Sequence, residues 1–89
     1  MGEDLRNSVN ALRTCRGQLD GIISMLEEGR NSIEVSNQIM AAQAMLKRAN
    51  KLLLVKHLDA CVREAVENPN NPAAPLADIG PLMNKLLEP

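Results

Sequence analysis

The chain has few residues that could carry chemistry, and two of them, His57 and Cys61, are four positions apart. On a helix this spacing places both side chains on one face, where they could share a metal ion or a reactive ligand. Two ligands make only half of a metal site, and a helical His–Cys pair also occurs as ordinary packing. The pair is therefore a candidate metal or effector site that needs further ligands.

The remaining polar residues do not indicate catalysis. We expect no Asp or Asn beside His57 to orient its ring. The sequence shows neither a glycine-rich loop before a helix nor a pair of carboxylates spaced for acid–base chemistry. We therefore predict that the protein is not an enzyme.

The cysteine pattern favours a reducing compartment. Cys15 and Cys61 are 46 positions apart and form no CxxC pair, which indicates neither a zinc finger nor a disulfide scaffold. Cys15 falls in an apolar stripe between Leu12 and Leu19, so we expect a buried small side chain rather than a ligand. The pattern predicts a cytoplasmic protein.

Length and composition narrow the class of protein. The 89 residues allow one domain, 1–89, with a single small core. The absence of Phe, Trp and Tyr excludes proteins that stack nucleic-acid bases on aromatic side chains. The net charge of −1 argues against non-specific coating of nucleic acid. No apolar run is long enough to cross a bilayer, so we expect no membrane partner.

The elements that must position these residues are helices. The pattern predicts an all-α fold with three helices at about 4–28, 32–66 and 77–87, and a Pro-rich linker at 67–75. Gly29 is expected to end the first helix, and Asn31 with Glu34 to cap the second. The second helix would run ~50 Å, which exceeds the width of a compact monomer of this mass.

Both long helices carry an apolar stripe that alternates in steps of three and four. The stripe comprises Leu12, Cys15, Leu19, Ile22 and Leu26 on the first helix, and Val35, Ile39, Ala42, Leu46, Ala49 and Leu53 on the second. Partner helices are needed to bury such a stripe. We therefore predict at least a dimer of this chain.

Cations gather in two segments, 5–19 and 35–58, that contain no acidic residue. If the long helices fold antiparallel about position 30, Arg13 lies level with Lys47 and Arg16 near Arg48. Repeated in an oligomer, this band could follow the phosphates of double-stranded DNA, although an ordinary solvated face would look the same. The predicted DNA-binding residues are Arg13, Arg16, Lys47, Arg48 and Lys51.

Three blocks of sequence resemble one known family. RGQLDGI at 16–22, MLEEGR at 25–30 and HLDACV at 57–62 are together similar to the CsoR/RcnR/FrmR family of small all-helical bacterial repressors. The resemblance implies three-helix protomers that pair into an antiparallel four-helix bundle and then form a tetramer as a dimer of dimers. It also implies binding to operator DNA, which a metal or an electrophile releases.

The resemblance further implies where the effector binds. Copper-sensing members use a cysteine at the start of the second helix of one protomer and His-x3-Cys of its partner. The second half matches His57 and Cys61, whereas the first falls on Ser32, whose hydroxyl is a poor ligand for Cu(I). The patterns for sensing formaldehyde, persulfide, nickel or cobalt are not matched in full either. The implied site is a degenerate set of Ser32, His57 and Cys61, with copper or another transition metal as the implied cofactor.

These observations predict a ligand-responsive, DNA-binding transcriptional repressor of the CsoR type that acts as a homo-oligomer. Its relatives tend to carry basic residues where this chain has Ala11 and Thr14. The alternative is therefore an all-helical module that does not bind DNA and instead carries a metal or a thiol.

Overall fold

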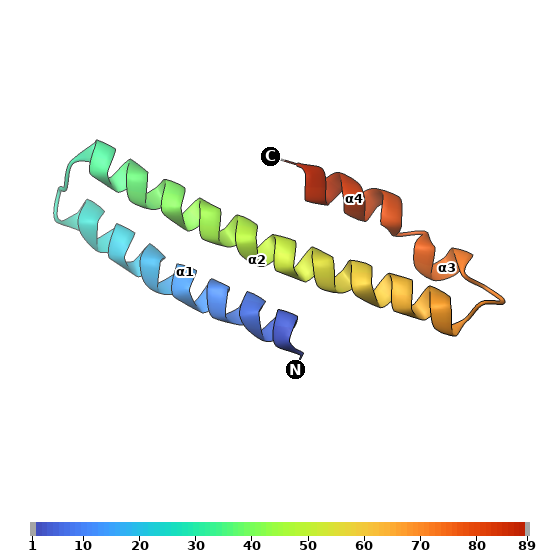
Figure 1. Ribbon diagram of the computed structural model, residues 1–89. Helices are drawn as coiled ribbons and strands as arrows, with labels where there is room; N and C mark the ends of the chain where they lie inside the picture. Colours follow the sequence, from blue (N-terminus) through green and yellow to red (C-terminus); the bar gives the residue numbers. More distant parts are fainter. Residues whose placement is uncertain (1, 89) are drawn as a thin grey trace.

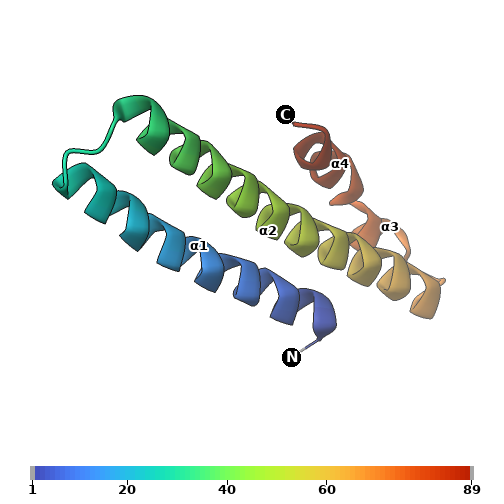
Figure 2. The ribbon, with the colours of Figure 1, turned by 60° about the vertical axis from the view of Figure 1, so that its left-hand side comes forward.

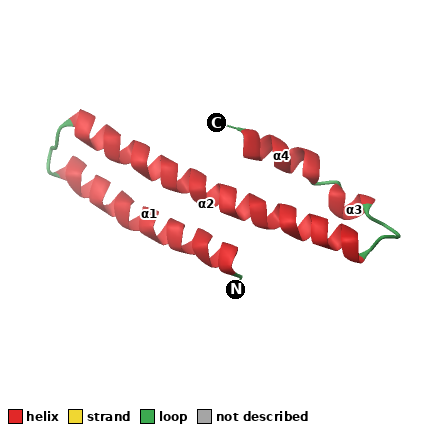
Figure 3. Cartoon of the chain, in the orientation of Figure 1, coloured by secondary structure: helices red, strands yellow, loops and turns green. Residues whose placement is uncertain are grey.

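The computed structural model describes residues 2–88, which form the helices α1 (Glu3–Glu27), α2 (Ser32–Glu67), α3 (Ala73–Leu76) and α4 (Ile79–Leu87). α1 and α2 make an antiparallel hairpin (Figure 1). α3 and α4 turn back along the C-terminal half of α2, on the side away from α1 (Figure 2). No strand occurs within residues 2–88 (Figure 3), so the predicted all-α class is confirmed.

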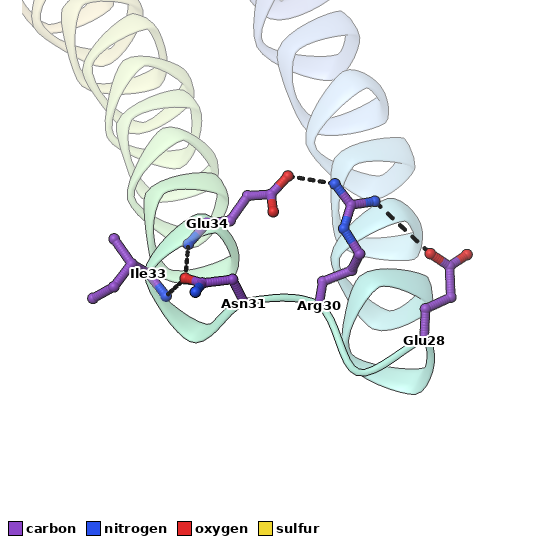
Figure 4. A network of polar contacts seen from close by, with 5 residues as sticks. All are labelled: Glu28, Arg30, Asn31, Ile33 and Glu34. Atoms are coloured by element: carbon purple, nitrogen blue, oxygen red, sulfur yellow. Dashed lines mark hydrogen bonds and ion pairs between the residues drawn. The ribbon is translucent and has the colours of Figure 1, made fainter.

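The turn between α1 and α2 forms as the sequence predicts. Gly29 adopts φ +71°, a left-handed conformation that glycine accepts without strain. The Asn31 side chain accepts hydrogen bonds from the backbone N–H groups of Ile33 at 2.8 Å and Glu34 at 3.3 Å. The Glu34 carboxylate does not return to the cap but forms an ion pair with Arg30 (Figure 4). The N-cap is therefore confirmed, while the reciprocal half of the capping box is replaced by this ion pair.

α1 and α2 pack through small residues that recur every seven positions. The Ser8 hydroxyl donates to the Ala49 carbonyl at 3.4 Å, and the Cys15 thiol donates to the Ala42 carbonyl at 3.7 Å. Residues that face each other in an antiparallel hairpin have numbers with a constant sum. This sum is 57 for both observed pairs, whereas a hairpin centred on position 30 predicts a sum of 60. The predicted register is therefore wrong by three residues, because these small side chains fix where the backbones approach each other.

The predicted apolar stripe divides into two columns. Cys15, Ile22, Val35 and Ala42 form the buried cluster inside the hairpin. The other column lies four positions after buried residues on each helix and is 42–60% exposed: Leu12, Leu19, Leu26, Ile39, Leu46 and Leu53. In an antiparallel helix pair, such positions on both helices lie on the same side. We call these six residues the open apolar face.

The protomer is a thin plate rather than a compact body. It measures 61 × 26 × 12 Å, and 12 Å is about the diameter of one helix with its side chains. Its radius of gyration is 18.0 Å. A compact domain of this length would have a radius of gyration of about 12 Å. A single layer of helices has no second layer of its own to cover the open apolar face.

The C-terminal segment differs from the predicted linker at 67–75 and helix at 77–87. The one-turn helix α3 begins at Ala73, inside that linker, and α4 begins at Ile79. Pro81 explains the break, because its ring would clash with the Ala77 carbonyl in one continuous helix. Starting α4 at Ile79 places Pro81 in the first turn, where proline is tolerated.

Candidate metal centre

A cluster of three possible metal ligands lies where the C-terminal segment meets α2. Nε2 of His57 lies 3.7 Å from the Cys61 sulfur and 3.2 Å from Oδ2 of Asp78. One ligand atom from each of the three residues lies within 4.8 Å of the other two. The structure thus brings the predicted pair together and adds a carboxylate to it.

Two different local causes place these side chains. His57 and Cys61 share a face of α2 because four residues make about one helical turn. Asp78 occupies the N-cap position of α4, where an aspartate commonly accepts hydrogen bonds from the first turn. Its side chain makes no such bond and approaches His57 instead. The expectation that no Asp stands beside His57 is therefore wrong, because the reversal of the chain after α2 brings Asp78 back.

The cluster is anchored on one side and open on the other. Cys61 is buried, and so is Leu82, which fixes α4 against α2. The side chains of His57 and Asp78 are 52% and 67% exposed. A shallow cavity of about 210 Å³ adjoins them, lined by Leu54, His57, Asp78, Pro81, Leu82 and Lys85. Solvent can therefore reach the His57 and Asp78 side chains, whereas Cys61 lies on the buried side of the cluster.

Ser32 and Cys15 lie far from this cluster within one protomer. Ser32 is the first residue of α2, so 25 helical residues separate it from His57 by roughly 37 Å. Cys15 is 2% exposed and faces Ala42, about 28 Å along α2 from Cys61, as expected for a packing residue. With a single thiolate, the cluster does not fit Cu(I), which prefers soft sulfur ligands.

The predicted DNA-binding residues fall into two groups. Lys47, Arg48 and Lys51 line one shallow cavity of about 420 Å³ on α2. Arg13 and Arg16 are exposed on the other long helix, α1. The observed register places Arg13 about level with Ala44, so the predicted alignment of Arg13 with Lys47 is wrong.

A groove between the long helices adds polar residues that the sequence did not single out. It has a volume of about 330 Å³ and is lined by Asn7, Asn10, Ala11, Thr14, Met45, Arg48 and Leu52. Arg48 lines both this groove and the cavity formed by the cations of α2, so the two sites are adjacent. Ala11 and Thr14, where relatives tend to be basic, lie in the same groove. Asn7 and Asn10 are three positions apart, and two asparagines at this spacing carry no sequence signal that would have identified the groove.

No helix within residues 2–88 combines the length and apolar character needed to span a membrane.

Comparison with known proteins gives a consistent result. The profile of a family described as metal-sensitive transcriptional repressor matches residues 4–86. The copper-sensing transcriptional repressor CsoR of Mycobacterium tuberculosis is 44% identical over 69 residues, which cover 78% of this chain and 58% of that protein. The copper-sensing repressor RicR of the same species is 40% identical over 60 residues, covering 67% of this chain and 62% of RicR. CsoR of Bacillus subtilis is 36% identical over 59 residues, covering 66% and 58%.

The chain thus spans about three fifths of the length of these relatives. No solved structure matches it. The family profile nevertheless covers nearly the whole described chain, including α1 except its first residue, all of α2 and the His57–Cys61–Asp78 cluster. The chain therefore belongs to the family of metal-sensitive transcriptional repressors, which confirms the resemblance in its three sequence blocks.

Proposed function

We propose that the protein is a cytoplasmic, homo-oligomeric transcriptional repressor that binds operator DNA and leaves it when a metal binds. The observation that carries this proposal is the match of the repressor family over residues 4–86, in a chain that places three metal ligands together. Its relatives are named as copper-sensing repressors, which supports a metal as the effector. No catalytic role is needed to explain the cluster.

The open apolar face supports self-association. Six large apolar side chains lie on one side of a plate 12 Å thick, and contiguous apolar patches of this kind mark interaction sites. Two hairpins that meet through this face would make an antiparallel four-helix bundle with both layers covered. Two such dimers would form the tetramer that we propose as the working assembly.

In that dimer, Ser32 of one protomer would lie near His57 and Cys61 of its partner. The geometry follows from antiparallel pairing of two α2 helices about a two-fold axis near Met45. Ser32 is exposed at the start of α2 and is free to face a partner helix. Its hydroxyl would contact the cluster without adding a thiolate.

The cations of α2 support a contact with duplex DNA. Lys47, Arg48 and Lys51 lie together on a segment without acidic residues, and the groove beside Arg48 offers the amides of Asn7 and Asn10. Cations and side-chain amides commonly bind phosphate oxygens. In the oligomer, where each protomer presents the same surface, Arg13 and Arg16 of α1 would add further contacts to DNA phosphates. These contacts position the protein on DNA and carry no base readout.

The salt dependence of binding to the DNA upstream of the protein's own gene tests this function. We expect affinity to fall steeply between 50 and 200 mM salt, because several phosphate contacts release counterions. Lys51→Glu should weaken binding and lower the slope of log K against log salt by at least about one. Arg63→Glu, which removes an exposed cation paired with Asp59 at the far end of α2, is the matched control and should bind normally.

The second candidate is a metal or thiol carrier that does not bind DNA. The net charge of −1 and the neutral residues Ala11 and Thr14 in the groove favour it. If the native protein binds metal but its binding to DNA is undetectable or independent of salt, the protein is a carrier rather than a repressor.

A further inference from the structure

We propose that His57, Cys61 and Asp78 of a single protomer bind a divalent cation of borderline softness, of the Zn²⁺ or Co²⁺ class, in place of Cu(I). This inference rests on the proposed function and deepens it by naming the class of metal and the third ligand. It departs from the site that the resemblance implies, because the third ligand is a carboxylate from the same chain rather than a thiolate from a partner.

The spacing of the ligand atoms fits a tetrahedral ion. Metal–ligand bonds of about 2.05 Å to nitrogen and oxygen and about 2.3 Å to sulfur give tetrahedral edges of about 3.3 Å for N···O and 3.6 Å for N···S. The observed distances are 3.2 Å between His57 Nε2 and Asp78 Oδ2, and 3.7 Å between His57 Nε2 and the Cys61 sulfur. These two edges need almost no movement, and the third is at most 4.8 Å long.

The chemistry of the ligands selects the metal. One imidazole, one thiolate and one carboxylate form a mixed nitrogen, sulfur and oxygen set, which Zn²⁺ and Co²⁺ accept. Cu(I) gains little from a hard carboxylate and lacks a second soft ligand, since the only other cysteine, Cys15, faces Ala42 inside the hairpin. The exposed side of His57 and Asp78 leaves a fourth position open to water.

The site would also couple the metal to the C-terminal segment. His57 and Cys61 belong to α2, whereas Asp78 is the N-cap residue of α4. An ion bound to all three would therefore tie α4 to α2 at the point where the His57–Asp78 contact now joins the two elements. Metal binding should reduce the opening of α4, which is short and frays easily on its own.

Titration of the purified full chain with Co²⁺ without oxygen tests the site directly. We expect one Co²⁺ per protomer, with a thiolate-to-cobalt charge-transfer band and the intense visible bands of tetrahedral Co²⁺. Cys61→Ser should abolish the charge-transfer band. Asp78→Asn, which keeps the shape of the side chain, should weaken Co²⁺ and Zn²⁺ binding at least tenfold. Asp20→Asn, the same change at an exposed position of α1, should bind normally.

Amide hydrogen exchange of α4 supplies a second readout. Zn²⁺ should slow exchange in α4 of the native chain and of Asp20→Asn but leave Asp78→Asn unchanged. Co²⁺ spectra and affinity that are unaltered in Asp78→Asn, or one ion per two protomers, would overturn the inference. Both measurements are made without DNA. Loss of the proposed repressor function would instead show as absent DNA binding by the metal-free native chain, so the two failures are distinguishable.

Discussion

Oδ2 of Asp78 lies 3.2 Å from Nε2 of His57, although 21 residues and the turn after α2 separate them along the chain. The contact joins the helix that carries the cysteine of the cluster to the last helix of the protomer. An ion bound between these two side chains would tie the C-terminal segment to α2 at this point. The same helix α2 carries Lys47, Arg48 and Lys51, so the candidate metal site and the cationic surface share one helix.

The open apolar face predicts how the protein assembles. Leu46→Lys places a charge in the middle of this face, where Leu46 is 46% exposed in the protomer. We expect the dissociation constant of the oligomer to rise about a hundredfold, equivalent to about 2.8 kcal/mol, because the lysine cannot be buried against a partner. Sedimentation velocity at micromolar concentration measures the shift towards a 9.7 kDa species.

Leu87→Lys is the control for this experiment, since Leu87 ends α4 and is 76% exposed. Its assembly should equal that of the native chain. A native protein that sediments as a folded 9.7 kDa monomer would contradict the role given to the open apolar face.

The sequence predicted those parts of the fold and site that depend on local geometry. The pairing of His57 with Cys61 follows from helical spacing, and the cap at Asn31 follows from its side chain and the glycine before it. Asp78 could not be predicted, because its position depends on the chain reversal and on Pro81 forcing α4 to begin at Ile79. Such a contact is set by tertiary packing, and no short-range pattern encodes it.

The register of the α1–α2 hairpin also depends on tertiary packing, so the sequence pattern did not predict it correctly. The stripe of apolar residues identified both long helices, but it did not say which of its columns is buried. Cys15 and Ala42 pack because they are small, and this choice moved the pairing by three residues. Burial of the small column left the larger Leu12 and Leu46 exposed, and only the structure shows which of the two columns is buried within the hairpin.

Cys15 and Cys61 should behave differently when each is replaced. Cys15→Ala should retain the thiolate-to-cobalt band, because the Cys15 sulfur contacts the Ala42 carbonyl rather than the cluster. It should lower the free energy of unfolding by about 1 kcal/mol through the loss of buried volume. Urea unfolding and Co²⁺ titration of the same preparation measure both effects. Loss of the Co²⁺ band in Cys15→Ala would mean that Cys15 is a ligand in the assembled protein.

Ser32→Cys tests the proposed antiparallel pairing of two α2 helices. If Ser32 lies opposite the partner's cluster, the new thiolate joins His57 and Cys61 and raises Cu(I) affinity sharply in a competition with a chelator. Ser36→Cys adds a thiol one turn further along α2 and should leave Cu(I) affinity near the native value. The pairing is wrong if the native chain already holds Cu(I) as tightly as Ser32→Cys.

The most direct test of a metal-responsive repressor is fluorescence anisotropy of the DNA upstream of the protein's own gene, measured with metal-free protein and again after adding Zn²⁺. We predict tight, salt-sensitive DNA binding without metal and at least a tenfold loss of DNA affinity with one Zn²⁺ per protomer, a coupling of about 1.4 kcal/mol. Asp78→Asn should bind the DNA normally and respond to Zn²⁺ only at higher concentration. Equal DNA affinity with and without saturating Zn²⁺ would mean that the metal does not release the protein from DNA.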